Sequence, residues 1–220
     1  MDLNEYALSG SCAPPAPPTV FVVDDDISIR NSLELLIECA GWRPFVYGSA
    51  SEFLSLPRVH APSCLILDVA LPGIGGFEVQ KLLADRVDMP IIFISGYADV
   101  PMTVRAMKAG AAEFLMKPFR EEALLNAIRD AIDRSHAALS RDAGMQALRA
   151  RYATLSRRER EVMALVVVGR LNKQVGGELG ISEITVKAHR GKMMRKMHAR
   201  SLGHLLGMAA ALGSISSPTS

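Results

Sequence analysis

Four short apolar runs of this chain end on side chains that can do chemistry. The first run, Val20–Val23, leads into an acidic pair, and the other three runs end at a carboxylate, a hydroxyl and an ammonium group: Asp24 and Asp25, then Asp68, Ser95 and Lys117. Carboxylates bind divalent metal ions and attack phosphorus, whereas hydroxyl and ammonium groups stabilise phosphoryl oxygens. Together, these residue types predict a phosphoryl-transfer site.

Buried parallel strands would position these groups. Runs rich in β-branched residues and bounded by breakers indicate buried strands, and helical patterns lie between them. The helices are expected at residues 29–40, 50–56, 77–83, 102–109 and 120–136, with a further strand at 45–47. This alternation predicts a parallel α/β sheet, and ligands of such sheets bind beyond the carboxyl ends of the strands.

The acidic residues of this edge need a cation. Two like charges about 4 Å apart repel by roughly 4 kcal/mol at an effective dielectric of about 20. We therefore expect Asp24, Asp25 and Asp68 to bind a hard divalent ion, and Mg²⁺ suits a site with few carboxylates. Each residue alone is usually a cap or a solvated turn, and the prediction depends on all of them occurring at successive strand ends.

Each of the other reactive groups then has a role. Asp68 is the expected nucleophile, because a carboxylate can accept a phosphoryl group as an acyl phosphate. Lys117 is expected to neutralise the phosphoryl oxygens, and Ser95 to donate a hydrogen bond to one of them. The Lys117–Pro118 peptide is a candidate cis bond, which the sequence leaves open.

Charge divides the chain into two parts. Residues 1–136 hold 11 Lys/Arg and 18 Asp/Glu, a net charge of −7, whereas residues 137–220 hold 14 and 5, a net charge of +9. With 49% hydrophobic residues, both parts can form a core, and the basic part is expected to face a polyanion. No apolar run reaches the roughly 20 residues that cross a bilayer. We expect no membrane partner, a cytoplasmic location, and Cys39 and Cys64 as buried thiols.

The chain is predicted to have five segments. These are a disordered Pro-rich arm (1–18), an α/β domain (19–136), a helical linker (137–152), an all-α domain (153–212) and a flexible tail (213–220). An apolar stripe continues past residue 136, so residues 121–151 are also compatible with one long helix. In the all-α domain, helices are expected at 157–168, 172–179, 183–197 and 202–212, with Ser156, Asn172, Ser182 and Ser201 as candidate caps.

Residues 19–136 resemble the receiver domain of two-component response regulators. The resemblance lies in the acidic pair, Asp68 followed by Pro72–Gly73, Ser95 and Lys117–Pro118, and residues 99–111 resemble the FixJ-like branch. It implies a five-stranded, doubly wound sheet of order 2-1-3-4-5 and phosphorylation of Asp68 by a sensor histidine kinase. It also implies that the backbone carbonyl of Ala70 binds the Mg²⁺ ion, and that Phe114 turns inward with Ser95 on activation.

The basic part predicts a helix-turn-helix. Two helices, at 172–179 and from residue 183, flank the short turn Gly180–Ser182, and the second carries several basic residues. A basic helix alone can be an ordinary solvated face. Gly176 and Gly177 within the first of these helices indicate either close helix packing or local fraying. The apolar residues Val186, Met193 and Met197 are expected in the core.

Residues 153–212 resemble the DNA-binding domain of the LuxR/NarL/FixJ type. The matching motifs are Arg158–Val162, Asn172–Lys173, Leu179–Ser182, Thr185–Lys187 and His189–Arg190. The resemblance implies that Thr185, Lys187, Ala188 and Gly191 face DNA, although Gly191 has no side chain to read a base. Lys173, Arg190 and Arg195 are better placed to contact phosphates.

The combined expectation is a response regulator in which phosphorylation of Asp68 switches dimerisation and binding to double-stranded DNA. The expected homodimer contacts are residues 102–109 with 114–117, and an apolar stripe of the last helix, Leu202, Leu205, Leu206 and Ala209. RNA polymerase is a further candidate partner. Two alternatives are a constitutive DNA-binding protein and a small-substrate phosphatase, which commonly has a carboxylate where this chain has Ala70. Apart from accepting the phosphoryl group and slow self-dephosphorylation, no enzymatic activity is expected.

Overall fold

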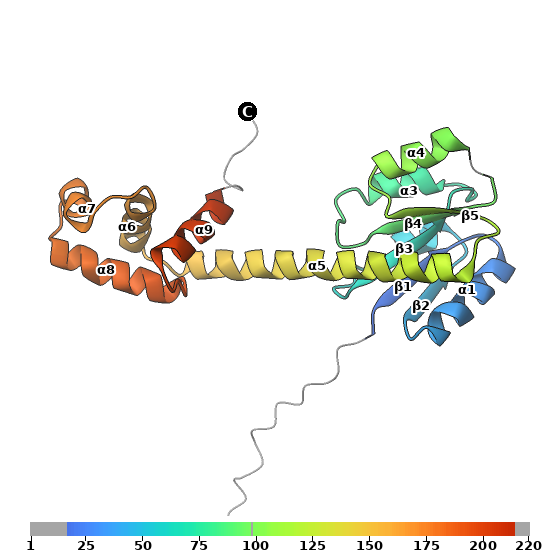
Figure 1. Ribbon diagram of the computed structural model, residues 1–220, viewed down its shortest axis with the longest axis horizontal. Helices are drawn as coiled ribbons and strands as arrows, with labels where there is room; N and C mark the ends of the chain where they lie inside the picture. The colour runs from blue at the N-terminus through green and yellow to red at the C-terminus, as the bar shows by residue number, and fades with distance from the viewer. Residues whose placement is uncertain (1–16, 98, 214–220) are drawn as a thin grey trace, which may run out of the picture. The chain divides into compact units, whose positions relative to one another are not determined.

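The first compact unit is built on a parallel sheet of five strands. A computed structural model describes residues 17–97 and 99–213. The strands are β1 (Thr19–Val23), β2 (Arg43–Tyr47), β3 (Ser63–Asp68), β4 (Ile91–Ser95) and β5 (Glu113–Met116). They lie in the order β2-β1-β3-β4-β5, which confirms the predicted topology (Figure 1).

Helices cover both faces of this sheet. On one face, α1 (Ile27–Cys39) and the first part of α5 (Glu121–Ala153) pack on a core that includes Ile37, Ile66 and Ile128. On the other face, α2 (Ala50–Leu54), α3 (Gly76–Leu82) and α4 (Val100–Lys108) cover a second core around Phe93. Because side chains alternate along each strand, successive strand residues supply the two cores in turn.

One cysteine prediction is confirmed and one is wrong. Cys64 lies in β3 and is fully buried, and this burial raises the pKa of its thiol to about 12. Cys39 is exposed. The buried residues of α1 are Leu33 and Ile37, and Cys39, the last residue of this helix, falls outside the apolar stripe that they form.

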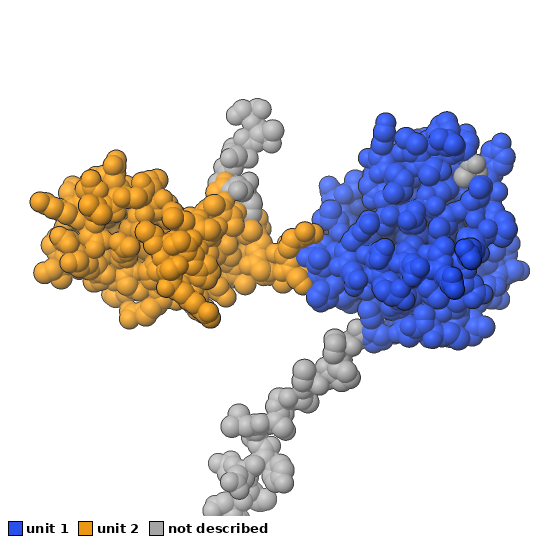
Figure 2. All heavy atoms as spheres, in the orientation of Figure 1, with its two compact units in different colours: residues 1–139 blue, residues 140–220 orange. Residues whose placement is uncertain are grey.

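The chain divides into two compact units, residues 1–139 and 140–220 (Figure 2). The helix α5 is continuous from Glu121 to Ala153, so the apolar stripe that runs past residue 136 belongs to one long helix. The expected arm and tail fall mostly on residues 1–16 and 214–220, outside the described part of the chain. None of the helices described here is long and apolar enough to span a membrane.

In its described part, the second unit has four further helices around one core. They are α6 (Arg157–Val167), α7 (Asn172–Leu179), α8 (Glu183–Lys196) and α9 (Leu202–Gly213). Val186, Met193 and Met197 are fully buried, as predicted, together with Val162 and Leu205. Ser156, Ser182 and Ser201 cap α6, α8 and α9 with their side chains, which confirms three of the predicted caps.

Two glycines shape the turn between α7 and α8. Gly180 ends α7 with φ of 66°, a left-handed conformation that favours glycine. Gly176 lies against the turn, because a Cβ atom there would come within 2.7 Å of the Ile181 carbonyl oxygen. Both Gly176 and Gly177 lie within α7. Close packing against the turn explains Gly176, but Gly177 has open space around it and no such explanation.

Two expectations for the second unit are wrong. Asn172 does not cap α7, because the N-cap is Leu171 and the Asn172 side chain accepts a hydrogen bond from Arg190 instead. Leu205 is fully buried in the core of its own unit and so cannot join a dimer contact. Leu202 and Leu206 on the same helix remain partly exposed.

Candidate phosphoryl-transfer site and DNA-binding face

The reactive residues of the first unit meet at one edge of the sheet. Asp24 follows β1, Asp68 ends β3, and Lys117 follows β5. The Lys117 Nζ atom lies 2.6 Å from Asp24 Oδ2 and 2.7 Å from Asp68 Oδ2, although 93 and 49 residues separate these partners. The parallel strands therefore bring the predicted residues together, and the Lys117–Pro118 peptide that follows β5 is cis.

Burial and charge act in opposite directions on these groups. Burial raises the pKa of the Asp24 carboxyl above its ordinary value, and the Lys117 ammonium and the Asp26 N–H only partly oppose this effect. Burial would lower the pKa of Lys117, but its hydrogen bonds to Asp24 and Asp68 outweigh burial and raise it. Lys117 is therefore a charged donor at neutral pH.

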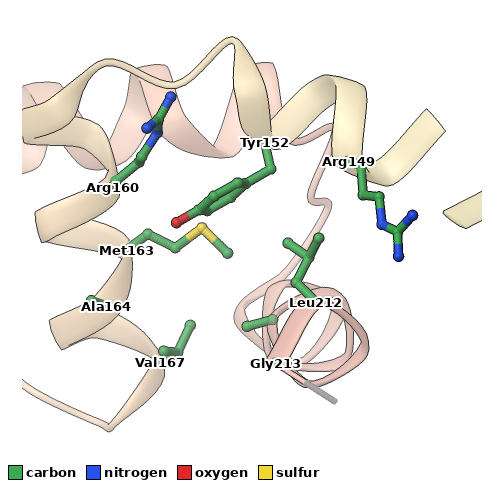
Figure 3. Close-up of a pocket in the computed structure, with 9 residues that line it drawn as sticks. Arg149, Tyr152, Arg160, Met163, Ala164, Val167, Leu212 and Gly213 are labelled. Atoms are coloured by element: carbon green, nitrogen blue, oxygen red, sulfur yellow. The ribbon is translucent and has the colours of Figure 1, made fainter. Parts of the chain in front are cut away.

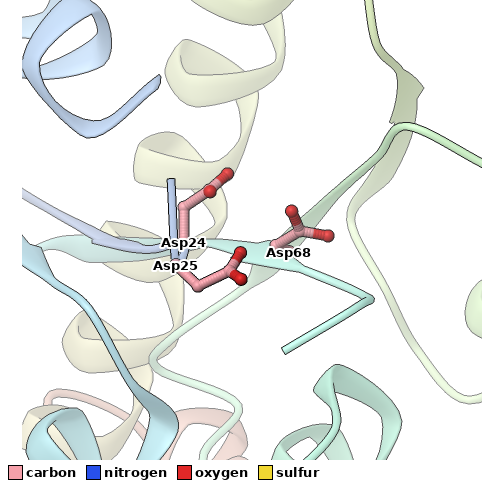
Figure 4. Close-up of side chains that lie close together, drawn as sticks. All are labelled: Asp24, Asp25 and Asp68. Atoms are coloured by element: carbon pink, nitrogen blue, oxygen red, sulfur yellow. The ribbon is translucent and has the colours of Figure 1, made fainter. Parts of the chain in front are cut away.

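Three carboxylates form a cluster that suits a divalent ion. One ligand oxygen each from Asp24, Asp25 and Asp68 lies within 4.8 Å of the others (Figure 4). With all three ionised, Lys117 neutralises one charge and leaves a net charge of −2. Hard oxygen donors with this surplus fit Mg²⁺. Ala70, whose carbonyl is the fourth expected ligand, is exposed, and its N–H donates to Asp68 Oδ1.

Ser95 lies at the same edge but is bonded elsewhere. Its side chain is buried, and its hydroxyl donates to the Tyr97 carbonyl at 2.6 Å. The Tyr97 N–H in turn donates to the Ser95 oxygen. To donate a hydrogen bond to a phosphoryl group, the Ser95 hydroxyl must first break its hydrogen bond with the Tyr97 carbonyl. No sequence pattern indicates this competing acceptor, because every residue has a backbone carbonyl.

Phe114 lines a hollow between α4 and β5. The hollow has a volume of about 350 Å³, and Val100, Val104 and Met116 share its lining. The Phe114 ring is partly buried and lies 6.1 Å from that of Phe93, centroid to centroid. The expected switch residue thus stands between the core and the surface of α4.

Sequence reasoning missed Arg30 as a part of this site. The Arg30 guanidinium donates from Nη1 to the Asp24 carbonyl at 2.7 Å, and it lies against Gly48. It therefore holds the backbone turn that carries the acidic pair. Its place six residues after Asp24, on the first turns of α1, is the only signal in the sequence, and that spacing alone does not indicate a contact.

The predicted DNA-contact residues gather on α8 and the start of α7. Lys187, Ala188, Gly191 and Arg195 are exposed, and so is Lys173 on α7. Thr185 is half-buried, and its hydroxyl shares a hydrogen bond of 2.8 Å with Ser182. Arg190 is half-buried and donates to Asn172 Oδ1, which ties α8 to α7.

Two features of this face were not predicted. Lys187 pairs with Glu183, one turn earlier on α8, with a distance of 3.0 Å between Nζ and Oε1. Ile184 is 81% exposed at the start of α8, unusual for a large apolar side chain. Apolar side chains can contact thymine methyl groups in the major groove. Exposure, which the sequence does not show, identifies Ile184 as a candidate contact.

Comparisons with known proteins agree with this architecture. The chain matches the family described as response regulator receiver domain over residues 20–129, and the bacterial regulatory proteins of the luxR family over residues 153–209. Nodulation protein W of Bradyrhizobium diazoefficiens is 49% identical over 195 residues, covering 88% of this chain and 86% of that protein. The transcriptional regulatory protein FixJ of Rhizobium meliloti is 40% identical, covering 89% and 96%.

A solved structure extends this likeness to both units. The response regulator StyR is 44% identical with a TM-score of 0.80, and the match covers 89% of this chain and 99% of that one. The two family matches coincide with the sheet unit and the helical unit described above. This chain belongs to the response regulators that join a receiver domain to a luxR-type DNA-binding domain.

Proposed function

We propose that Asp68 accepts a phosphoryl group from a sensor histidine kinase, and that this modification switches dimerisation and DNA binding. The observation that carries the proposal is the meeting of Asp24, Asp25, Asp68 and Lys117 at one sheet edge. Asp68 is the better acceptor than Asp24, because the Asp24 side chain is fully buried and this burial raises the pKa of its carboxyl, whereas the Asp68 side chain is 8% exposed.

In the transfer step, a carboxylate oxygen of Asp68 attacks the phosphorus of a phosphohistidine on the kinase. The new O–P bond forms an acyl phosphate while the N–P bond breaks and the histidine nitrogen leaves with its electron pair. Lys117 then donates to the phosphoryl oxygens. Asp24, Asp25, Asp68 and the Ala70 carbonyl would hold Mg²⁺, which supplies positive charge against those oxygens when bound.

The switch would begin with the hydrogen bond of Ser95. When Ser95 turns from the Tyr97 carbonyl to the phosphoryl group, Phe114 follows into the space behind it and changes the hollow beside α4. Three exposed apolar side chains line this hollow, Val100, Val104 and Met116, and Met107 on α4 is exposed as well. They supply the kind of surface that a second copy would cover, which supports a homodimer formed through α4 and β5.

For DNA binding, α8 would enter the major groove. Lys187 can donate to a guanine edge, and Ile184 and Ala188 can touch thymine methyl groups, while Lys173, Arg190 and Arg195 contact phosphates. Thr185 and Gly191 complete the proposed face, although Gly191 adds no side-chain contact. A two-fold dimer would bind two half-sites, and RNA polymerase is then a candidate partner at the promoter.

The test compares Asp68 with Asp26, which lies two residues after Asp24 and is outside the carboxylate cluster. The purified chain is treated with acetyl phosphate and Mg²⁺, and intact-mass spectrometry follows the gain of one phosphoryl group. Wild type and Asp26→Asn should gain it, because Asp26 only caps α1 and Asn is an equally good cap. Asp68→Asn should not gain it and should not acquire the higher operator affinity. Phosphate on Asp68→Asn, or wild-type DNA activation by that variant, would contradict the proposal.

A further inference from the structure

A second hollow lies within the DNA-binding unit. It has a volume of about 350 Å³ and is enclosed by the last turns of α5, by α6 and by the end of α9. Tyr152, Met163, Val167 and Leu212 form its largely apolar wall (Figure 3). All its lining residues belong to residues 140–220, so it is a feature of one compact unit.

Two arginines stand at the rim of this hollow. Arg149 and Arg160 both line it, and both side chains are exposed. The Arg160 guanidinium lies over the Tyr152 ring and donates to the Ala153 carbonyl, which holds it near the mouth. Arg149, from the preceding turn of α5, also lines the hollow, and its side chain points away from Arg160, so the two guanidinium groups lie apart (Figure 3).

No carboxylate in the described part of the unit neutralises these two arginines. Glu159 pairs with Lys196, Glu161 with Arg157 and Arg158, Glu178 with Arg170, and Glu183 with Lys187. Asp142 accepts instead from the Gln146 amide. The rim therefore carries two positive charges above an apolar floor, and guanidinium groups favour carboxylates as partners.

We propose that this hollow binds a small anionic amphiphile, with its aliphatic chain between α6 and α9 and its carboxylate at Arg160, while Arg149 adds a second positive charge to the rim. The volume lies in the range of small-molecule sites, roughly 300–1,000 Å³. A helix, with a diameter of about 10 Å, is too wide to enter it. The ligand would contact three helices at once and so would hold α9 against α6.

Calorimetric titration of the full chain tests the site with three probes of one chain length. These are sodium decanoate, uncharged decanol and cationic decyltrimethylammonium, all used below their micelle concentrations. Decanoate should bind saturably and raise the unfolding midpoint of the second unit by a few degrees. The other two probes should bind at least about tenfold more weakly, because they lack the charge that the arginines recognise.

Two variants separate the apolar and the charged parts of the site, and two further variants serve as controls. Ala164→Phe fills the hollow and should abolish decanoate binding, and Arg149→Gln with Arg160→Gln should weaken it about tenfold. Arg200→Gln, which removes an exposed arginine that is not part of the lining, should bind like wild type. Asp68→Asn should also bind like wild type, so failure here is independent of the phosphorylation proposal.

Several results would overturn the inference. Equal binding of decanol and decanoate would make the hollow a non-specific apolar patch, and unchanged binding in Ala164→Phe would place the ligand elsewhere. Absence of saturable binding in wild type would remove the site. If Ala164→Phe instead changes the oligomeric state in light scattering while decanoate does not bind, then a second copy of the chain is the occupant.

Discussion

Lys117 and Lys196 each hold a buried carboxylate at the same distance, yet the two contacts have different surroundings. Lys117 Nζ lies 2.6 Å from Asp24 Oδ2 in the receiver unit, and Lys196 Nζ lies 2.6 Å from Glu159 Oε2 in the DNA-binding unit. Among the described residues, Lys196 pairs with one carboxylate, whereas Lys117 binds both Asp24 and Asp68, and Asp25 adds a third carboxylate to that cluster. The charges of the Lys196–Glu159 pair therefore balance, and we call it the complete pair. The charges around Lys117 do not balance, and we call that group the incomplete cluster.

The complete pair is part of the architecture. Glu159 is 3% exposed and also accepts from the Ser156 N–H, while Lys196 donates to the Thr154 carbonyl as well. These bonds tie α6, α8 and the end of α5 together. The incomplete cluster keeps a surplus of negative charge that the protein itself does not neutralise, which is what a site for an external cation and a phosphoryl group requires.

Breaking the complete pair should give the largest loss of stability. Lys196→Met leaves the Glu159 carboxylate buried without its cation, so the free energy of unfolding of the second unit should fall by about 2 kcal/mol. Urea unfolding followed by circular dichroism measures this change. Lys192→Met, on the same helix and exposed, should change stability by less than about 0.5 kcal/mol. Equal losses in both variants would show that the pair has no special role.

Acid should weaken the same pair without a mutation. Burial opposes ionisation of Glu159, but the hydrogen bonds from Lys196 and from Ser156 outweigh it and lower the pKa of this carboxyl below its ordinary value of 4.5. The resulting stabilisation is fully present above pH 4.5 and is lost as the pH falls through the lowered pKa. Urea midpoints of the second unit measured from pH 6 downwards should show this loss. Glu159→Gln should show a smaller pH dependence in that window.

Removing a charge from the incomplete cluster should raise stability, whereas removing one from the complete pair lowers it. Asp25→Asn removes one of three like charges, so without Mg²⁺ the receiver unit should become more stable by about 1 kcal/mol. Trp42, the single tryptophan of the chain, packs beside the sheet and reports unfolding of this unit. Added Mg²⁺ should stabilise wild type but not the variant. A destabilised variant that still responds to Mg²⁺ would show that the carboxylates do not form a shared site.

The sequence predicts the cluster well because topology, rather than detailed packing, brings it together. Parallel strands place their carboxyl ends at one edge, so residue types at the ends of apolar runs are sufficient to find Asp24, Asp68 and Lys117. The Glu159–Lys196 pair joins residues 37 positions apart on different helices, and no local pattern shows it. Only the spacing of Ser156 and Glu159, which is that of a capping box, was available as a hint.

Other features could not be predicted from the sequence for a similar reason. The acceptor of Ser95 is a backbone carbonyl, and Asn172 binds Arg190 across 18 residues instead of capping its own helix. The apolar residues around Cys39 in the chain predict a core position, but its place in the last turn of α1 exposes it. Each of these errors concerns where a side chain points, whereas strand and helix order follows from the apolar pattern.

A third lysine–carboxylate pair, Lys187–Glu183, extends the comparison to the surface. Both side chains are largely exposed, so the pair adds little stability, but it occupies the lysine that we expect at a guanine edge. Glu183→Gln should therefore raise the affinity for duplex DNA by about threefold at low salt. Fluorescence anisotropy with a labelled duplex measures this change, which should shrink as added salt screens the charges.

The matched control is Glu178→Gln, which removes the same charge from the same unit. Glu178 pairs with Arg170 on a different part of the surface, so its loss should change DNA affinity through net charge alone. A gain that is equal in both variants would mean that Glu183 acts only through the overall field of the unit. A gain confined to Glu183→Gln would show that the Lys187–Glu183 pair competes with DNA for the Lys187 ammonium. This exposed pair would then limit DNA binding, whereas the Lys196–Glu159 pair stabilises the fold and the cluster around Lys117 forms a site.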